Sequence, residues 1–395
     1  MHSEKVNYKR IFSLDLPAGQ CVFIWGPRQA GKSTFLAEHY PDSVLFDLLK
    51  TDNFLEFSKR PFLLREQILA LSEEQKRQPI IIDEIQKVPQ LLDEVHWLTE
   101  NHSLGFILCG SSARKLKSNT VNLLGGRAWV FHFFPLCSRE IPDFDLLQSF
   151  NNGLLPSIYH QKPANAKRSL KAYVEAYITE EVKGEGLTRN LPAFARFMES
   201  LRFSHGEVIN FTNIAREVGV DSKTVQEYYN ILVDTLLGFL ISPFRKKANR
   251  EIIKSAPKFH LMDTGVANYI CKRNINDLKG SDAGRSLEHL ILLELLSYRS
   301  LKEKDFTINY WRTKLGVEVD FILDSGSVSV EVKISNRVDK KDLLGLAAFA
   351  EEHQPKRSIL ICLEERRRKV SLPQCEIEII PVLTFLKSLW ADEII

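Results

Sequence analysis

Short runs of apolar residues recur in the first part of the chain, and each run ends in a polar loop. The runs are Cys21–Trp25, Ile80–Ile82 and residues 106–109. Apolar runs of this kind, bounded by turn or charged residues, are typical of strands buried in a parallel sheet. The residues after the first run suit the start of a helix. The pattern therefore predicts an α/β domain at the front of the chain.

The loop after the first run has the spacing of a phosphate-binding loop. Residues 26–33 read GPRQAGKS and fit the pattern G-x-x-x-x-G-K-[ST]. The glycines would let backbone N–H groups surround a β-phosphate, and the helix start would add positive charge. We expect Lys32 to reach the β- and γ-phosphates and the Ser33 hydroxyl to bind Mg²⁺. The residues predicted to contact ATP are Gly26, Pro27, Arg28, Gln29, Ala30, Gly31, Lys32, Ser33 and Thr34.

The next two runs predict the other half of an ATP site. Asp83 and Glu84 directly follow the run Ile80–Ile82. Asp83 is expected to hold the metal through its water shell, and Glu84 to orient or deprotonate the attacking water. Ser111 follows the third run, as the polar residue of a sensor strand does in AAA-type ATPases, and would contact ATP or that water. Together these motifs predict an ATPase with ATP and Mg²⁺ as cofactors.

Two arginines are candidates for a group that reaches the γ-phosphate of a neighbouring subunit. Arg127 follows a glycine pair just before another apolar segment, and Arg114 is the alternative. Such an arginine stabilises the charge that develops on the transferred phosphoryl group. A structural salt bridge explains either residue equally well. A catalytic role for Arg127 would require a homo-oligomer, such as a ring.

Residues 209–244 have the pattern of a helix-turn-helix followed by a strand. Residues 211–218 suit a short amphipathic helix, Gly219 suits the turn, and Asp221 or Ser222 can cap a second helix. The residues expected to form the shared apolar face are Ile214, Val218, Val220, Val225, Tyr229 and Leu232. This layout, with a strand as the wing, predicts a winged helix.

The second of these helices would present polar side chains to solvent. Lys223, Gln226 and Asn230 lie on its expected outer side, where they would meet a DNA groove. Glu227 lies on the same helix and opposes DNA binding, and winged helices also serve as lids and protein-binding modules. DNA is the predicted partner of this surface.

Residues 317–335, VEVDFILDSGSVSVEVKIS, place charged residues on two strands joined by a turn. Counting with a period of two places Asp320 on one face of the first strand, and Glu331 and Lys333 together on one face of the second. Two carboxylates can hold a divalent ion, which activates water, and a lysine can neutralise charge on a phosphate. Glu288, near the start of an apolar helix at residues 286–298, is a candidate third carboxylate. We therefore predict a Mg²⁺ or Mn²⁺ site with a catalytic lysine.

Two alternatives for the hairpin stay open. It can be a hairpin whose charged outer face is ion-paired and solvated, or an inactive nuclease kept as a scaffold. A register shift of one residue would also separate Asp320 from Glu331.

Composition and charge add little about partners but indicate the compartment. The 395 residues carry a formal net charge of +3, with 44% hydrophobic and 26% charged residues, as in ordinary globular proteins of more than one domain. The six cysteines are scattered, and three lie in apolar strand-like runs, which suits reduced thiols. The charged N-terminus lacks a signal peptide's apolar region, and no apolar helix is long enough to span a bilayer. We expect a cytoplasmic protein without a membrane partner.

Several segments together resemble a family of bacterial and archaeal AAA-type ATPases. These segments are GPRQAGKST, IIIDEIQKVP, LCGSS, LLGGR with FPLCSRE, APKFHLMDTGVAN, and YWRTKLGVEVDFIL with VEVK. Members carry a C-terminal domain of unknown function related to the PD-(D/E)XK, restriction-endonuclease-like nucleases. Here Val319 stands where that name has proline. Asp263 matches a family hallmark, and a helix cap is its expected role.

The resemblance covers most of residues 15–365 and implies an α/β architecture of several domains. The implied parts are an AAA-type P-loop ATPase domain at 1–150, a helical lid or connector at 151–200, a winged helix at 201–250, and a PD-(D/E)XK nuclease-like domain at 251–395.

Three functions follow from these expectations. The first is an ATP-hydrolysing DNA-processing enzyme, an endodeoxyribonuclease that acts on branched DNA or Holliday junctions in repair, recombination or defence. The second is a nucleotide-dependent regulatory or defence switch whose nuclease-like domain only binds a partner or nucleic acid. The third is an RNA-directed nuclease with the same site.

Overall fold

The computed structural model describes residues 7–112, 127–178, 190–245 and 256–395. The chain divides into two compact units. The N-terminal unit comprises Asn7–Leu136 together with Asn230–Leu237. The C-terminal unit comprises Cys137–Tyr229 and Gly238–Ile395. The predicted Arg114 lies outside the described residues.

A parallel five-stranded sheet forms the centre of the N-terminal unit, in the order β2-β3-β4-β1-β5. Its strands are β1 (Cys21–Trp25), β2 (Leu45–Asp47), β3 (Ile80–Asp83), β4 (Phe106–Gly110) and β5 (Ala128–His132). Every residue of β1, β3 and β4 is buried, as the apolar runs predict. The three strands that precede the polar motifs are therefore neighbours at the middle of the sheet.

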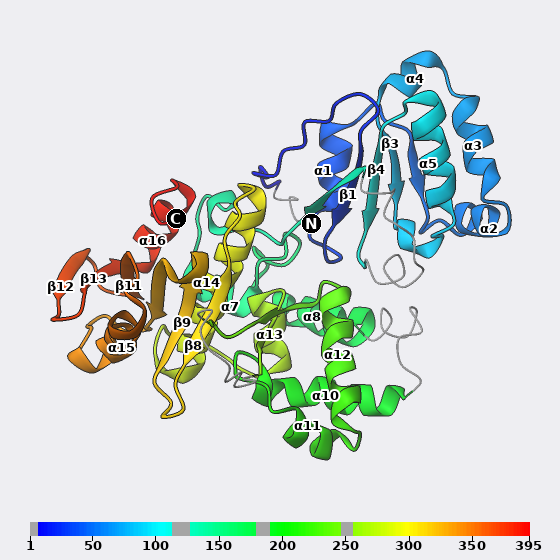
Figure 1. Ribbon diagram of the computed structural model, residues 1–395. Helices are drawn as coiled ribbons and strands as arrows, with labels where there is room; N and C mark the ends of the chain where they lie inside the picture. Colours follow the sequence, from blue (N-terminus) through cyan, green and yellow to red (C-terminus); the bar gives the residue numbers. More distant parts are fainter. Residues whose placement is uncertain (1–6, 113–126, 179–189, 246–255) are drawn as a thin grey trace. The chain divides into compact units, whose positions relative to one another are not determined.

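Helices cover both faces of this sheet (Figure 1). They are α1 (Lys32–His39), α2 (Thr51–Lys59), α3 (Phe62–Leu69), α4 (Glu73–Arg77) and α5 (Leu91–His102). One face packs Phe23 and Leu108 against apolar side chains of α2, α3 and α5. On the other face, Phe35 of α1 joins an aromatic cluster with Phe12 and Phe133. Apolar burial on both faces keeps the strand ends in fixed positions.

The first part of the C-terminal unit is helical, as the sequence predicts. Its helices are α7 (Leu146–Asn152), α8 (Pro163–Ala172), a π-helix (Tyr173–Ile178), α10 (Leu191–Ser204), α11 (Phe211–Val218), α12 (Ser222–Asp234, whose residues from Asn230 onward belong to the N-terminal unit) and α13 (Thr264–Ile270). Asp263 caps α13, because its carboxylate accepts from the backbone N–H of Val266 at 2.9 Å. It also accepts from the N–H of Leu154 at 2.5 Å. The expected capping role of Asp263 is confirmed.

Helices α11 and α12 have the helix-turn-helix features expected from the sequence. Gly219 ends α11 in the left-handed conformation, with φ of 77°. The carboxylate of Asp221, and not Ser222, caps α12 by accepting from the N–H groups of Lys223 and Thr224 at 2.8 and 2.9 Å. Strands β6 (Gly238–Ile241) and β7 (Lys258–Leu261) pair antiparallel.

A six-stranded sheet forms the second part of the C-terminal unit, in the order β12-β13-β11-β10-β9-β8. The strands are β8 (Ile308–Arg312), β9 (Glu318–Leu323), β10 (Val328–Val332), β11 (Arg357–Cys362), β12 (Arg368–Ser371) and β13 (Glu376–Pro381). The accompanying helices are α14 (Gly280–Leu301), α15 (Leu344–His353) and α16 (Val382–Trp390) (Figure 1). β8, β9 and β10 are antiparallel, whereas β10, β11 and β13 run parallel.

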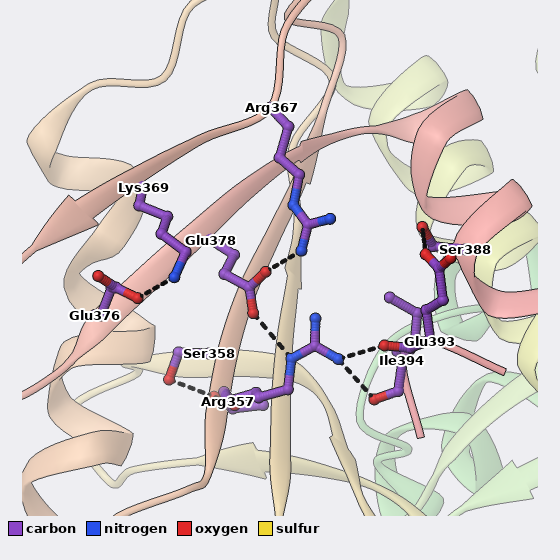
Figure 2. Close-up of polar contacts among 10 residues, drawn as sticks. Arg357, Ser358, Arg367, Lys369, Glu376, Glu378, Ser388, Glu393 and Ile394 are labelled. Carbon is purple, nitrogen blue, oxygen red and sulfur yellow. Dashed lines mark hydrogen bonds and ion pairs between the residues drawn. The ribbon is translucent and has the colours of Figure 1, made fainter. Parts of the chain in front are cut away.

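Three residues of the basic run at 366–369, namely Arg367, Arg368 and Lys369, are ion-paired at the edge of this sheet. Arg367 and Arg357 both contact the carboxylate of Glu378, and Lys369 pairs with Glu376 at 2.6 Å (Figure 2). Arg357 also donates to the backbone carbonyls of Glu393 and Ile394. Charged pairs on an edge strand discourage pairing with other chains. The run is thus a solvated, paired edge.

Candidate functional sites

The loop between β1 and α1 has the shape that phosphate binding requires. Gly31 precedes α1 with φ of 100°, a conformation that favours glycine. A side chain at Gly26 would collide with the backbone carbonyl of Phe133. The ammonium group of Lys32 is buried and donates to the carbonyl oxygens of Gly26 and Pro27. The loop therefore holds the Lys32 ammonium group close to the N-terminus of α1.

An arginine that sequence reasoning missed supports this loop. Arg10 donates to the carbonyl of Ala30 and to that of Phe134, both at 2.7 Å. Its guanidinium also lies 4.3 Å from the centre of the Phe133 ring. Arg10 is far from the motif in sequence, and a lone arginine near the N-terminus carries no recognisable signal. Its contacts join the loop to the chain that follows β5.

The acidic pair of β3 lies beside the loop. The Ser33 hydroxyl donates to Asp83 at 3.2 Å, so the two predicted Mg²⁺ ligands are in contact. The Glu84 carboxylate accepts from the Ser111 hydroxyl at 3.0 Å and from the amide of Gln86. Gln86 and Ser111 also bond each other at 3.2 Å. The structure thus brings Ser33, Asp83, Glu84 and Ser111 together, and it adds Gln86, which sequence reasoning missed.

Burial changes the charge balance of this site. Removal from water lowers the pKa of Lys32, an effect that Glu84 and Asp83 oppose. Burial and the neighbouring Glu84 raise the pKa of Asp83, while Lys32 opposes the rise. The buried amine suits a nucleotide phosphate, and the two buried carboxylates suit its Mg²⁺. A nucleotide with Mg²⁺ therefore supplies the negative and the positive charge that would balance these groups.

The predicted trans-acting arginine has a nearby partner instead. Arg127 forms an ion pair with Glu100, and both side chains are well exposed. This is the salt bridge that the sequence left as the alternative. The catalytic role of Arg127 stays a prediction.

The predicted DNA-contacting residues share the solvent side of α12. Lys223, Gln226 and Asn230 are exposed, and so is Glu227. Val225 and Tyr229 on the other side are buried. The expected division between an apolar and a polar side is confirmed, whereas the DNA contact stays a prediction.

Charged residues of the C-terminal sheet gather around β9 and β10. Val330 pairs with Phe321, so the next residues on each strand, Glu331 and Asp320, are neighbours. The carboxylate of Asp320 accepts from the N–H of Val332 at 2.8 Å. Lys333 forms an ion pair with Glu331 at 2.5 Å. The register shift that would have separated Asp320 from Glu331 does not occur.

The expectation of a solvated outer face is wrong for this hairpin. Glu331 is 6% exposed, and every residue of β10 is buried. The physical reason is that helices flank the sheet, with α14 and α15 both packed on β10. The charges of Glu331 and its neighbours therefore act on one another with little screening by water.

Two residues of this cluster were missed by sequence reasoning. Lys258 of β7 is buried and pairs with Glu318 of β9 and with Glu288 of α14, the latter at 3.2 Å. Glu318 also pairs with Arg312 at 3.4 Å. The predicted third carboxylate, Glu288, is thus in the cluster but has an ammonium partner. We call Lys258, Glu288, Glu318, Asp320, Glu331 and Lys333 the acidic cluster.

The pKa directions follow from this burial. Burial raises the pKa of Asp320 and of Glu331, and the carboxylates of Glu288 and Asp320, respectively, add to these rises. Burial alone would lower the pKa of Lys258, but the carboxylates of Glu288, Asp320 and Glu318 outweigh it and raise the pKa. The lysine is therefore firmly charged, while the two strand carboxylates resist ionisation.

The acidic cluster fits a divalent ion in one respect and not in another. Glu331 Oε2 is buried and has no hydrogen-bond partner among the described residues, so a ligand oxygen is available. In the described ranges, however, the single group of three or more histidine, cysteine or acidic residues with ligand atoms within 4.8 Å of one another consists of histidines. A metal held by Asp320, Glu331 and Glu288 would need these side chains to move together.

Two solved structures have a partial likeness to the chain. One is the Aeropyrum pernix ORC1 protein in complex with DNA, with 12% identity, 64% of this chain and 86% of that chain covered, and a TM-score of 0.27. The other is a signal transduction ATPase with numerous domains and a tetratricopeptide repeat sensor from Pyrococcus horikoshii, with 12% identity, coverage of 72% and 47%, and a TM-score of 0.21. Likeness at this level does not bear on the activity of this chain.

Related sequences come from mycobacteria. Uncharacterized proteins of Mycobacterium tuberculosis and Mycobacterium bovis are each 23% identical over 312 residues, which is 77% of this chain and 67% of each relative. Within the described ranges, no helix has the length and apolar character needed to cross a bilayer.

Three family models match consecutive parts of the chain. Residues 143–278 match a domain of unknown function, DUF8612, and residues 283–385 match another, DUF4143. Residues 18–142 match the AAA domain, over the part that contains the loop, Lys32, Asp83 and Glu84. With the geometry above, this match supports an AAA-type P-loop ATPase that uses ATP, with Mg²⁺ as its usual ion.

Proposed function

We propose that the chain is an ATP-hydrolysing, DNA-binding protein whose C-terminal domain is a metal-dependent nuclease acting on branched DNA. The observation that carries the nuclease part is the Glu331 carboxylate, buried beside Asp320 and Lys333 with one oxygen unpartnered among the described residues. Repair, recombination and defence are the settings in which this chemistry is used.

In the ATPase, the residues divide the work by position. Lys32 would release its loop carbonyls and bind the β- and γ-phosphates. Ser33 and Asp83, already in contact, would hold Mg²⁺, which supplies charge neutralisation at the transferred phosphate. Glu84 would take the proton of the attacking water, while Ser111 and Gln86 fix its carboxylate.

The order of elements supports a nuclease-like domain. Helix α14 precedes the antiparallel strands β8, β9 and β10, and α15 leads to β11, which runs parallel to β10. This is the helix, strands, helix, strand order expected of the restriction-endonuclease-like core. Asp320 of β9 and Glu331 of β10 lie on adjacent strands, next to each other.

In the nuclease step, the chain's own residues would bind and orient the DNA phosphate. Asp320, Glu331 and Glu288 would hold Mg²⁺ or Mn²⁺, which supplies an activated water and neutralises charge on the phosphate. Lys333 would position that phosphate by its charge. Lys258 would have to release Glu288, because one carboxylate oxygen already accepts from its ammonium group. Lys223, Gln226 and Asn230 would contact DNA separately.

The test is a cleavage assay on labelled linear, forked and four-way DNA with Mg²⁺ or Mn²⁺, with and without ATP. Wild-type protein is compared with Asp320→Asn and Lys32→Ala. Glu378→Gln is the matched control, because Glu378 is a buried, ion-paired carboxylate on β13 of the same sheet. The proposal expects metal-dependent cleavage that Asp320→Asn abolishes and Glu378→Gln keeps. Cleavage preferring four-way DNA would support the branched substrate.

A second function is favoured by Lys258, which already neutralises two carboxylates of the acidic cluster. In that case the chain is a nucleotide-dependent switch whose C-terminal domain binds a partner without cutting it. Intact ATP hydrolysis with no cleavage of any DNA would support the switch and reject the nuclease. Cleavage of RNA but not DNA would assign the same site to an RNA-directed nuclease.

A further inference from the structure

Three histidines meet inside the C-terminal unit, away from the residues assigned to either activity. They are His205, His260 and His289, and they are 2%, 1% and 1% exposed. Their ring centres are 4.6 to 5.5 Å apart. One ligand atom from each ring lies within 4.8 Å of the others. Such a convergence of buried imidazoles calls for a chemical cause.

The strand β7 holds all three rings in place. His260 is in the middle of β7, whereas His205 directly follows α10 and bridges to Phe259. The N–H of Gly206 donates to the Phe259 carbonyl at 2.8 Å. His289 of α14 bonds the Leu261 carbonyl through Nε2 at 2.7 Å. The two outer histidines are therefore fastened to the residues on either side of His260.

The ring nitrogens lack the partners that buried polar groups normally have. Both nitrogens of His205 and both of His260 are buried without a hydrogen-bond partner in the described parts of the chain. Buried polar atoms without partners are rare, and each one needs a physical reason such as a bound ion. Packing of the imidazole rings in an apolar core does not explain four unpartnered ring nitrogens in the same place.

The backbone hydrogen bond of His289 orients its ring for metal binding. Because Nε2 of His289 donates to a backbone carbonyl, Nδ1 keeps its lone pair. This is the outer contact that metal-bound histidines usually make, since it fixes the tautomer and the ring direction. Burial lowers the pKa of His289 to about 4, and it lowers the pKa values of His205 and His260 well below normal. All three rings are thus neutral, as metal ligation requires.

We propose that His205, His260 and His289 bind one divalent transition-metal ion, with zinc the best fit, which fastens α10 and α14 to β7. Imidazole nitrogens suit zinc, copper, iron and nickel, and tetrahedral zinc takes nitrogens at about 2.0–2.1 Å. Three nitrogens on such an ion are about 3.3 Å apart, so small ring rotations from the present spacing are enough. The site goes beyond the ATPase and nuclease, and it stands if either of them is rejected.

The cations near the three histidines are paired with carboxylates. Arg273, Arg285 and Lys258 are the nearby cations, and each has an acidic partner: Asp282, Glu207, and Glu288 with Glu318. The two terminal nitrogens of Arg273 are buried without a partner among the described residues. Their N–H groups can donate to an anion or to a water oxygen. An anion or a water is therefore the expected fourth ligand.

The test counts the metal and identifies its ligands on the full chain. Chelator-treated protein is refilled with Zn²⁺ or Co²⁺, desalted and analysed for bound metal and for Co²⁺ absorption in the visible range. The arms are wild type, His205→Gln, His260→Gln, and His353→Gln as a partly buried histidine away from the other three. Glu331→Gln tests whether the acidic cluster holds the ion instead.

We expect one ion per chain that stays at the three histidines after desalting, apart from any ion held by the acidic cluster, with strong visible Co²⁺ absorption typical of four-coordination and a higher melting temperature with the ion. His205→Gln and His260→Gln lose these properties, whereas His353→Gln and Glu331→Gln keep them. Near-UV circular dichroism shows which variants fold. If His205→Gln and His260→Gln fail to fold, X-ray absorption at the zinc edge of the wild-type protein identifies the ligands instead. About three imidazole ligands are expected. No bound ion, an ion that survives in a folded His260→Gln variant, or an ion without imidazole ligands overturns the proposal.

Discussion

The ATP site and the acidic cluster use the same kinds of groups but balance them differently. At the ATP site, Lys32 lies on backbone carbonyls, and Glu84 accepts from the neutral Ser111 and Gln86. In the acidic cluster, each lysine is paired directly with a carboxylate. The charged groups of the ATP site therefore have neutral partners and can pair with a ligand. The charges of the acidic cluster, in contrast, largely neutralise one another.

The two regions therefore have different requirements for catalysis. The ATP site needs only the nucleotide and its metal to complete the charge balance. The acidic cluster must first exchange ammonium contacts for a metal ion, which costs the ion pairs made by Lys258 and Lys333. Substitutions in the two regions should consequently behave differently.

The largest effect is expected at Glu84. Glu84→Gln keeps the shape but removes the base, so ATP hydrolysis should fall about 10²–10⁴-fold while ATP binding is kept. Steady-state phosphate release and binding of a fluorescent ATP analogue measure the two quantities. A variant that hydrolyses ATP at the wild-type rate would remove Glu84 from the mechanism.

Lys258 should have the largest effect on stability. Lys258→Met leaves the partly buried Glu288 and Glu318 without their shared, buried cation, so the free energy of unfolding should drop by about 3–5 kcal/mol. Added Mn²⁺ should restore part of this loss, because it can replace the missing charge. Urea unfolding with and without Mn²⁺ measures both effects. Lys369→Met, which breaks an exposed pair with Glu376, is the control and should cost about 0–1 kcal/mol.

Ser111 should have a smaller effect on ATP hydrolysis than Glu84. Ser111→Ala removes one hydrogen bond to a carboxylate, which contributes about 1.5–3 kcal/mol. If this bond positions Glu84 for the reaction, kcat falls roughly 10–100-fold with little change in KM. An equal loss in a variant that already carries Glu84→Gln would show that Ser111 acts independently of Glu84.

The pH dependence separates the acidic cluster from ordinary surface carboxylates. The pKa values of Asp320 and Glu331 are raised in the folded protein, so folding takes up protons above the normal carboxyl pKa of about 4. This contribution to stability is present at low pH and is lost as pH rises through the raised values. Mn²⁺ binding should show the opposite trend and weaken at least about tenfold from pH 8 to pH 6. Titrations of wild type and Glu331→Gln at both pH values measure it, and a pH-independent affinity contradicts the assignment.

Arg127 should have the smallest effect on the isolated chain. Its pair with Glu100 is exposed, so Arg127→Ala should change the free energy of unfolding by about 0–1 kcal/mol. ATP hydrolysis per chain that grows with protein concentration in wild type but not in Arg127→Ala would instead assign the arginine to a neighbouring active site. Glu100→Gln is the control, because it breaks the same pair without removing the arginine.

The ATP site could be predicted from the sequence because its residues lie in short, contiguous motifs. Lys32, Asp83 and Glu84 each follow or end a buried strand, and their spacing alone indicates their neighbours. Arg10 was missed because it is far from the motifs in sequence, and Gln86 because the acidic motif specifies only Asp83 and Glu84.

The interior of the C-terminal unit could be predicted only in part. Alternation along β9 and β10 assigns Asp320 and Glu331 each to one face, and the register seen in the structure makes them neighbours. In β7, by contrast, the polar Lys258 and His260 alternate with apolar residues, yet every residue of the strand is buried. Lys258 lies against carboxylates of α14 and β9, and His260 against His205 and His289. Contacts between segments this far apart in the chain leave no local pattern.

The most direct test measures DNA cleavage and ATP hydrolysis in the same preparation of wild type and Glu331→Gln. We expect that wild type cleaves branched DNA with Mn²⁺ and that Glu331→Gln loses cleavage while its ATP hydrolysis continues at the wild-type rate. Cleavage that persists in Glu331→Gln, or its absence in a wild type that hydrolyses ATP, would contradict the nuclease assignment.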